Sequence, residues 1–176
     1  MQQVVLVDEQ DKEIGSMEKM EAHRNALLHR AFSVFIFNPS GEMLLQRRAL
    51  GKYHSGGLWT NACCSHPGPG EAVLDAAQRR LREEMGFSTP LEKVFDFVYK
   101  ESFDNGLTEY EFDHVFVGRY DGKIFPDREE VEDYRYQTIE KVRESLKAHP
   151  ERYTVWFPIA FQALLDRLPL VFLPRG

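Results

Sequence analysis

Five side chains along the sequence have the types that bind a divalent metal ion: His23, His29, His66, Glu109 and Glu111. In an extended strand Glu109 and Glu111 would point to the same face while Tyr110 points away, so both carboxylates can reach one ion. Neutral imidazoles combined with carboxylates form a mixed nitrogen and oxygen shell that suits Mn²⁺, Mg²⁺ or Zn²⁺. Taken singly, each residue is better explained as a solvated glutamate at a strand edge or a scattered histidine, so the predicted metal site depends on the five meeting in the fold.

Two adjacent cysteines, Cys63 and Cys64, provide a candidate reactive thiol. A disulfide between neighbours would be strained and would close no useful loop, so we expect free thiols in a reduced, cytoplasmic protein. A buried cysteine usually packs as a small apolar side chain. If a strand extends to His66, Cys64 lies on the same face of the strand as His66 and Cys63 lies on the opposite face. Cys64 is then the thiol that lies near the metal and the substrate. A nearby cation would lower the pKa of Cys64 and increase its thiolate fraction.

A charged segment follows, with the pattern Ser65-x5-Glu71-x7-Arg79-Arg80-Leu81-Arg82-Glu83-Glu84-Met85-Gly86-Phe87. The spacing fits an amphipathic helix whose Arg79–Glu83 and Arg80–Glu84 pairs each contribute only about 0.2–0.5 kcal/mol. The pattern also resembles the Nudix box, in which carboxylates on a helix bind divalent metal beside a diphosphate. Ser65 stands where that box has Gly and Arg80 where it has Glu, so one carboxylate used by the hydrolases is missing. A diphosphate site adapted from cleavage to binding would have this pattern.

The elements that must position these residues are mainly strands. Apolar and β-branched runs bounded by turn residues predict strands over 4–7, 31–37, 43–46, 58–64, 94–101 and 109–120, with the second and third forming a hairpin. Apolar spacing predicts a clear helix over 71–85 that ends at Gly86, and two more over 139–147 and 157–168, with Pro150 and Pro169 as breakers. This order indicates an α+β fold, an α/β/α sandwich in which a mixed sheet is flanked by helices.

The whole chain has 176 residues, a mass of 20.5 kDa and a formal net charge of −6, and we find no repeat or linker that divides it. We therefore expect a single Nudix-like catalytic domain over 1–176. The acidic balance disfavours nucleic acid as a partner, and the sequence has no apolar run of 18 residues that would predict a membrane segment. A monomer or a weak homodimer is expected.

Further motifs, in the same order along the chain, make the resemblance more specific. They are His29-Arg30-Ala31-Phe32-Ser33, Thr60-Asn61 through Cys64-Ser65-His66-Pro67, Asp96-Phe97-Val98-Tyr99 and Glu109-Tyr110-Glu111. Together they resemble type 1 isopentenyl diphosphate isomerase from about Lys19 to Trp156. The resemblance implies metal-dependent conversion of isopentenyl diphosphate to dimethylallyl diphosphate, a small-molecule reaction of isoprenoid precursor synthesis.

The same resemblance implies roles for individual residues. The three histidines with Glu109 and Glu111 would hold one metal, and Glu84 with the Cys64 carbonyl would hold a Mg²⁺ that bridges to the substrate diphosphate. Cys64 and Glu111 would be the catalytic pair, assisted by Tyr99 and by the indole of Trp156. The diphosphate-binding bases would be Lys19, Arg48, Lys52 and Arg80. Each of these bases alone would be read as an exposed, solubilising charge.

The implied reaction adds a proton at one end of an alkene and removes another two carbons away, so an acid and a base must face opposite sides of the substrate. An indole such as that of Trp156 can stabilise the tertiary cation by about 2 kcal/mol when desolvated, although packing beside Phe157 is the commoner role. Two alternatives stay open: a Nudix pyrophosphohydrolase of a nucleoside diphosphate derivative, which Arg80 disfavours, and a catalytically silent, metal-stabilised binding domain.

Overall fold

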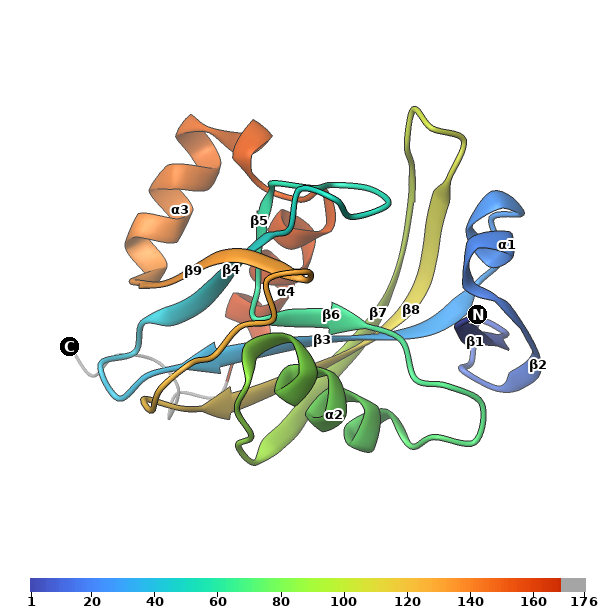
Figure 1. Ribbon diagram of the computed structural model, residues 1–176, viewed down its shortest axis with the longest axis horizontal. Coiled ribbons are helices and arrows are strands. Elements are labelled where there is room, and N and C mark those ends of the chain that lie inside the picture. Colours follow the sequence, from blue (N-terminus) through green and yellow to red (C-terminus); the bar gives the residue numbers. More distant parts are fainter. Residues whose placement is uncertain (169–176) are drawn as a thin grey trace.

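The computed structural model describes residues 1–168, which form a mixed sheet of nine strands with helices on both faces (Figure 1). The strands are β1 (Gln3–Val7), β2 (Glu13–Glu18), β3 (His29–Phe37), β4 (Met43–Arg48), β5 (Trp59–Thr60), β6 (Cys63–Ser65), β7 (Leu91–Ser102), β8 (Thr108–Arg119) and β9 (Val131–Gln137). The helices are α1 (Lys19–Arg24), α2 (Val73–Met85), α3 (Ile139–Ala148) and α4 (Trp156–Arg167), with a short 3-10 helix η1 at Pro150–Arg152.

Strand β3 organises the sheet, because it pairs with strands from four other parts of the chain. Strand β8 runs parallel to β3 from His29, opposite Glu111, to Phe37, opposite Arg119. Strand β7 pairs antiparallel with β8 along almost its full length, and the two form the long hairpin on the right of Figure 1. The short strand β6 pairs antiparallel with β3, with Ser33 opposite Cys64. These registers determine which polar side chains meet.

Alternation along β3 builds a separate core on each face of the sheet. Phe32, Val34 and Ile36 pack with the apolar face of α2, whereas Phe35 and Phe37 pack with α4 on the opposite face. Successive residues of a strand point to opposite faces, so a strand that is apolar at almost every position must be covered on both sides. The predicted α/β/α sandwich is confirmed.

Helix α2 ends where the sequence predicts. Gly86 adopts the left-handed conformation at φ 74°, and its N–H bonds to the carbonyl of Arg82. A Cβ at this position would lie 2.3 Å from the carbonyl oxygen of Phe125. The position therefore requires glycine for its backbone angle and for the close approach of another chain segment.

Several predicted elements need correction. The expected strand over 58–64 is two short strands, β5 and β6, which pair with β4 and β3 respectively. The expected hairpin is confined to one pair beside the turn, Phe37 with Met43. Beyond that pair β3 has β6 and β8 as its neighbours, and β4 has β5 and β9. Strand β9 and the segment β2–α1 were not predicted, since β9 and β2 are polar and α1 has only six residues. Pro169 and the rest of 169–176 lie outside the described residues; within 1–168, no helix is long and apolar enough to cross a membrane.

Candidate active site

The register of the sheet brings the predicted metal ligands together from distant segments. His29 of β3 lies opposite Glu111 of the parallel strand β8, and Tyr99 of β7 lies opposite Glu111 on its other side. His66 directly follows β6, the antiparallel partner of β3, and His23 is on α1. Four elements and one connecting segment therefore meet where β3 begins.

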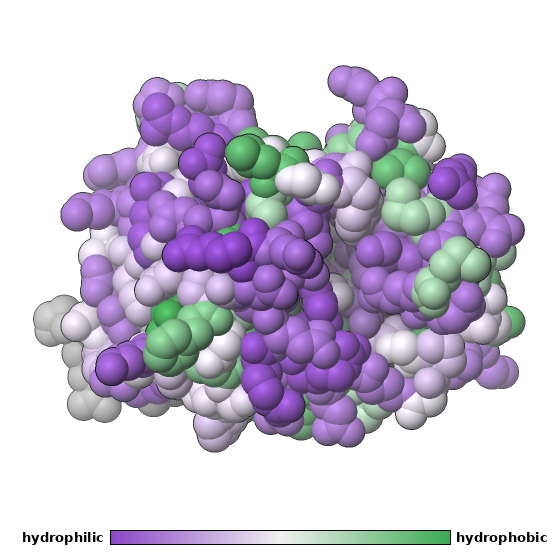
Figure 2. Space-filling model, viewed as in Figure 1, coloured by the Kyte–Doolittle hydropathy of each residue, from purple (hydrophilic) through white to green (hydrophobic). Residues whose placement is uncertain are grey.

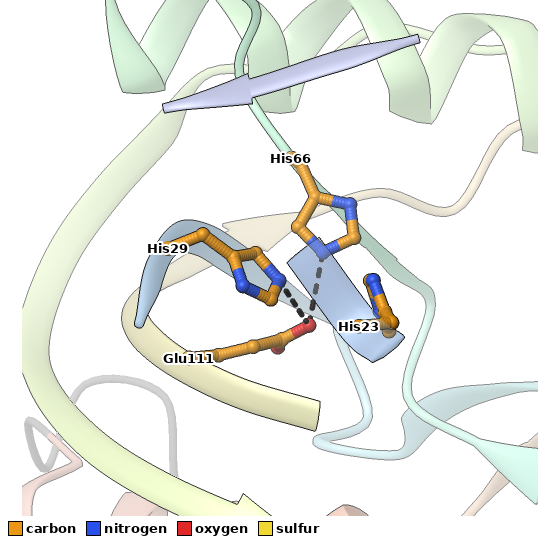
Figure 3. A group of neighbouring side chains, drawn as sticks. All are labelled: His23, His29, His66 and Glu111. Atoms are coloured by element: carbon orange, nitrogen blue, oxygen red, sulfur yellow. Dashed lines mark hydrogen bonds and ion pairs between the residues drawn. The ribbon is translucent and has the colours of Figure 1, made fainter. Parts of the chain in front are cut away.

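Four of the five predicted ligands form a compact, buried group, drawn in Figure 3: His23, His29, His66 and Glu111. One ligand atom of each lies within 4.8 Å of the others. Oε1 of Glu111 is 2.9 Å from Nε2 of His66 and 3.5 Å from Nε2 of His29. Figure 3 shows the three imidazoles and the carboxylate pointing toward one another.

Local backbone contacts orient two of these rings. Nδ1 of His23 lies 2.6 Å from the carbonyl oxygen of Lys19, and Nδ1 of His29 lies 2.8 Å from that of Leu27. The Nε2 atoms of both rings are buried and make no hydrogen bond. Histidines that bind metal usually donate their other N–H to a carbonyl or carboxylate, which sets the tautomer and aims the free nitrogen at the ion. The residues present therefore fit a divalent metal ion.

Electrostatics around this group favour the protonation states that metal binding needs. Burial lowers the pKa of His23 to about 4 and also lowers the pKa of His66. Burial opposes the charged form of His29 as well, but contact with Glu111 outweighs it and raises its pKa. Burial opposes the charged form of Glu111, but contact with His29 and His66 outweighs it and lowers the pKa of its carboxyl well below the usual range. The group thus contains a carboxylate and at least two neutral imidazoles near pH 7.

Glu109, the fifth predicted ligand, lies beside this group and not within it. Its Oε1 is 2.6 Å from Nε2 of His54, and the hydroxyl of Tyr99 donates to its Oε2. Tyr99 also donates to Oε2 of Glu111 at 3.0 Å, so one phenol bridges the two carboxylates. Glu109 and His54 form a second potential ligand group with His23. His54 was not predicted, because it stands alone in an irregular segment between β4 and β5 with no spacing signal.

Cys64 and Glu111 line the same pocket, which is also lined by Tyr99, Trp156 and Arg48. The sulfur of Cys64 lies 3.1 Å from Oδ1 of Asn61 and 3.6 Å from the hydroxyl oxygen of Ser33. That hydroxyl donates to Asp113 at 2.7 Å. Ser33, Asn61 and Asp113 had not been identified from the sequence as neighbours of the thiol.

The two cysteines separate as strand alternation predicts. Cys63 is fully buried, packs in the core beneath α2 and donates to Oε2 of Glu84 at 2.7 Å. Burial and the charge of Asp113 raise the pKa of Cys64 to about 12, and its lowering by a nearby cation stays a prediction. The resting group in this structure is therefore a thiol.

Trp156 opens α4 and is 3% exposed. Its ring lines the pocket, and the guanidinium carbon of Arg48 lies 5.3 Å from the ring centroid. The neighbouring Phe157 packs in the core between the sheet and α4. The indole of Trp156 therefore lies at the pocket, whereas the phenyl ring of Phe157 lies in the core.

Three of the four predicted diphosphate-binding bases form one cluster. Glu130 accepts from Lys52 Nζ at 2.6 Å and from Arg80 at 3.2 Å, and Arg80 also donates to Glu84 at 3.1 Å. The ammonium of Lys19 lies 4.4 Å from the centroid of the Tyr53 ring, which Lys52 also approaches. Burial and the nearby charge of Lys52 lower the pKa of Lys19.

The fourth base, Arg48, lies in the pocket and bonds to the carbonyl of His54 at 3.2 Å. Glu130, which joins Lys52 to Arg80, was not predicted from the sequence.

The face in Figure 2 is largely hydrophilic, with a notch at its upper edge.

Comparisons with known proteins find relatives over most of the chain. The family model for the NUDIX domain matches residues 27–157. A protein of Photorhabdus laumondii named isopentenyl-diphosphate Delta-isomerase 2 is 52% identical over 154 residues, which cover 88% of this chain and 87% of the relative. An isopentenyl-diphosphate Delta-isomerase of Burkholderia multivorans is 48% identical over 174 residues, or 99% of this chain and 97% of the relative.

Solved structures share the fold at low sequence identity. A crystal structure from Deinococcus radiodurans has a TM-score of 0.75 at 18% identity and covers 92% of this chain and 98% of its own. The MutT protein of Methanosarcina mazei has a TM-score of 0.65 at 18% identity, over 79% of this chain and 94% of its own. These likenesses concern the arrangement of the sheet and helices.

Proposed function

This chain belongs to the NUDIX family and, within it, to the isopentenyl-diphosphate Delta-isomerases, and from that membership we propose how its residues isomerise their substrate. Its function is the isomerisation of an isoprenoid precursor, isopentenyl diphosphate. The observation that carries the proposed mechanism is the shared pocket of Cys64 and Glu111, two proton-exchanging groups held on different strands.

Cys64 and Glu111 are the proposed catalytic pair. The five-carbon tail lies between them, one group adds a proton to the terminal alkene carbon, and the other removes a proton two carbons away. The double bond thereby moves, and atoms and charge balance because one proton enters as another leaves. A positioned acid or base typically contributes 10²- to 10⁴-fold to the rate. Tyr99 holds the Glu111 carboxyl in place through its 3.0 Å hydrogen bond.

The metal centre would be held by the three histidines with Glu111 and Glu109. The identity proposed for this ion is Mn²⁺, Zn²⁺ or Mg²⁺, because a mixed nitrogen and oxygen set accepts several divalent ions. When bound, the ion supplies positive charge that fixes the carboxyls and increases their acidity. Tyr99, His29 and His66 hold the Glu111 carboxyl at the pocket wall.

The diphosphate would be held by the basic cluster of Lys19, Lys52 and Arg80, with Arg48 reaching from the pocket. Glu84 and the Cys64 carbonyl would hold a Mg²⁺, which would supply positive charge for the substrate diphosphate. Charge-assisted contacts of lysine, and bidentate contacts of arginine, anchor phosphate groups strongly. Binding energy from the diphosphate can therefore hold the small apolar tail against the catalytic pair.

Trp156 is proposed to stabilise the tertiary cation formed when the alkene is protonated. Its face offers negative π density at the pocket wall, and this attraction is worth about 2 kcal/mol or more in a desolvated site. Because the indole is almost fully buried, little water competes for the cation.

Proton NMR of isopentenyl diphosphate in D₂O with the protein, Mg²⁺ and Mn²⁺ tests the proposal. We expect dimethylallyl diphosphate to form with deuterium uptake and without phosphate release. Cys64→Ala should abolish most turnover, whereas Cys63→Ser, which keeps a donor toward Glu84, should retain it. Full turnover in Cys64→Ala would overturn the assignment of the thiol, and release of phosphate would indicate a hydrolase.

We further propose that residues 1–176 act as one catalytic domain, as a monomer or weak homodimer in the cytoplasm, with no nucleic-acid or membrane partner. The net charge of −6 supports the part that concerns nucleic acid. Light scattering of the purified protein at several concentrations tests the oligomeric state.

A further inference from the structure

His54 is a buried histidine for which the proposed mechanism has no use. It lies between β4 and β5 with only 6% of its surface exposed. Its ring stacks on Phe103 with centroids 4.7 Å apart and planes at 11°, and it meets the rings of Tyr53 and Trp156 edge to face at 4.3 and 5.6 Å. Aromatic contacts on three sides hold the imidazole in one orientation.

The nitrogens of His54 repeat the pattern of His23 and His29. Nδ1 lies 3.1 Å from the hydroxyl oxygen of its neighbour Ser55, a local partner like the carbonyls at the other two rings. Nε2 is buried and makes no aligned hydrogen bond, although Oε1 of Glu109 is only 2.6 Å away. A ring nitrogen and a carboxylate oxygen this close, without an aligned hydrogen bond between them, are arranged as two donors to one cation.

The second ligand group places His54 at the metal centre already described. One ligand atom each of His23, His54 and Glu109 lies within 4.8 Å of the others. Nδ1 of His23 is occupied by the Lys19 carbonyl, so only Nε2 of His23 can bind metal, and an imidazole nitrogen binds one ion. The two groups therefore share that nitrogen and lie side by side around it. The rings of His23 and His54 have centroids 6.3 Å apart, and those of His23 and His66 are 5.9 Å apart.

We propose that His54 is a fourth histidine ligand of the metal centre, binding through Nε2 on the side of Glu109. The inference rests on the metal centre of the proposed function. It adds a ligand from the segment between β4 and β5, which contributes none of the other proposed ligands. It also gives the packing of Phe103 and Trp156 a role, because the rings that enclose His54 would hold a ligand in place.

The test counts imidazoles bound to the metal. Full-length protein is loaded with Co²⁺, and the number of imidazole ligands is measured by X-ray absorption for the wild type and for His54→Gln. We expect four in the wild type and three in the variant, with a Co²⁺ affinity about 10–100-fold lower. His114→Gln is the matched control, because His114 is also 6% exposed, with Nε2 unbonded and 2.9 Å from Asp11 outside the centre.

Equal counts in the wild type and in His54→Gln would overturn the proposal, whatever the affinities. Three imidazoles in the wild type would overturn it as well, and that measurement needs no variant to fold. Turnover is measured separately on the same wild-type sample. Four bound imidazoles in a protein that does not isomerise the substrate would support the ligand and contradict the proposed function.

Discussion

Glu111 and Tyr99 are direct cross-strand neighbours, and the hydroxyl of Tyr99 donates a 3.0 Å hydrogen bond to Oε2 of Glu111. On its other flank Glu111 faces His29 of the parallel strand β3. One carboxylate therefore has its two oxygens assigned, Oε1 to the histidines and Oε2 to the phenol. Oε1 therefore lies on the side of the proposed metal ligands, whereas Oε2 accepts the hydrogen bond of Tyr99.

Tyr99→Phe should lower kcat with little change in KM, because the phenol touches the carboxylates and not the diphosphate cluster. The expected loss is about 10²-fold, the lower end of the contribution of a positioned acid or base. Steady-state kinetics by NMR measures both constants. A kcat within twofold of the wild type would contradict the positioning role of Tyr99.

Arg80→Gln should raise KM more than it lowers kcat. Arg80 is expected to leave Glu84 and Glu130 in part to bind phosphate oxygens, and hydrogen bonds to charged groups are worth about 1.5–3 kcal/mol, or roughly 10- to 100-fold in KM. Arg82→Gln is the control on the same helix, because Arg82 is exposed and donates to Ser88 instead. An unchanged KM in Arg80→Gln would remove Arg80 from the diphosphate site.

Without metal, the protein should lose stability as the pH falls from 7 toward 4. Folded His23 has a pKa of about 4, whereas an unfolded histidine has one near 6.5, so the unfolded state binds more protons in this range. His66 acts in the same direction and His29 in the opposite one. Urea midpoints in EDTA, measured from pH 7 to 4.5, should fall less steeply in His23→Gln than in the wild type.

The control for this pH dependence is His149→Gln, since His149 is exposed and remote in sequence from the centre. Its slope should match that of the wild type. A His23→Gln slope equal to the wild-type slope would show that His23 is not buried in its neutral form.

Trp156→Leu should lower kcat by roughly 10- to 30-fold, the equivalent of the cation–π attraction of about 2 kcal/mol. Trp156→Phe should lose less, because a phenyl ring keeps part of the π density. Trp59→Phe is the control, since Trp59 packs against the guanidinium of Arg135, 4.2 Å from the ring centroid, and does not line the pocket. Equal kcat in Trp156→Leu and Trp156→Phe would argue for packing alone.

Gly86→Ala should destabilise the protein by more than about 2 kcal/mol, because the new Cβ meets the Phe125 carbonyl in addition to the backbone strain. Gly70→Ala has a similar φ of 77° but nothing within 4 Å of the new Cβ. Its cost should be about 1–2 kcal/mol, the left-handed penalty by itself. Denaturant unfolding compares the two, and equal costs would exclude a contribution from the clash.

Local patterns in the sequence determined much of this site. The period of two places Glu109 and Glu111 on one face and separates Cys64 from Cys63, and helical spacing with a terminal glycine defines α2. Such features depend only on neighbours along the chain, so a single sequence is sufficient to predict them. The motif order allowed the family to be inferred as well.

Only the tertiary structure decided which distant residues meet. The parallel register of β3 and β8 sets His29 beside Glu111, and the fold brings Glu130 between Lys52 and Arg80 and His54 against Glu109. It also decides burial, which raises the pKa of Cys64. Register and burial are set by pairing between strands and by core packing, which sum over many residues far apart in the chain, so no local spacing encodes them.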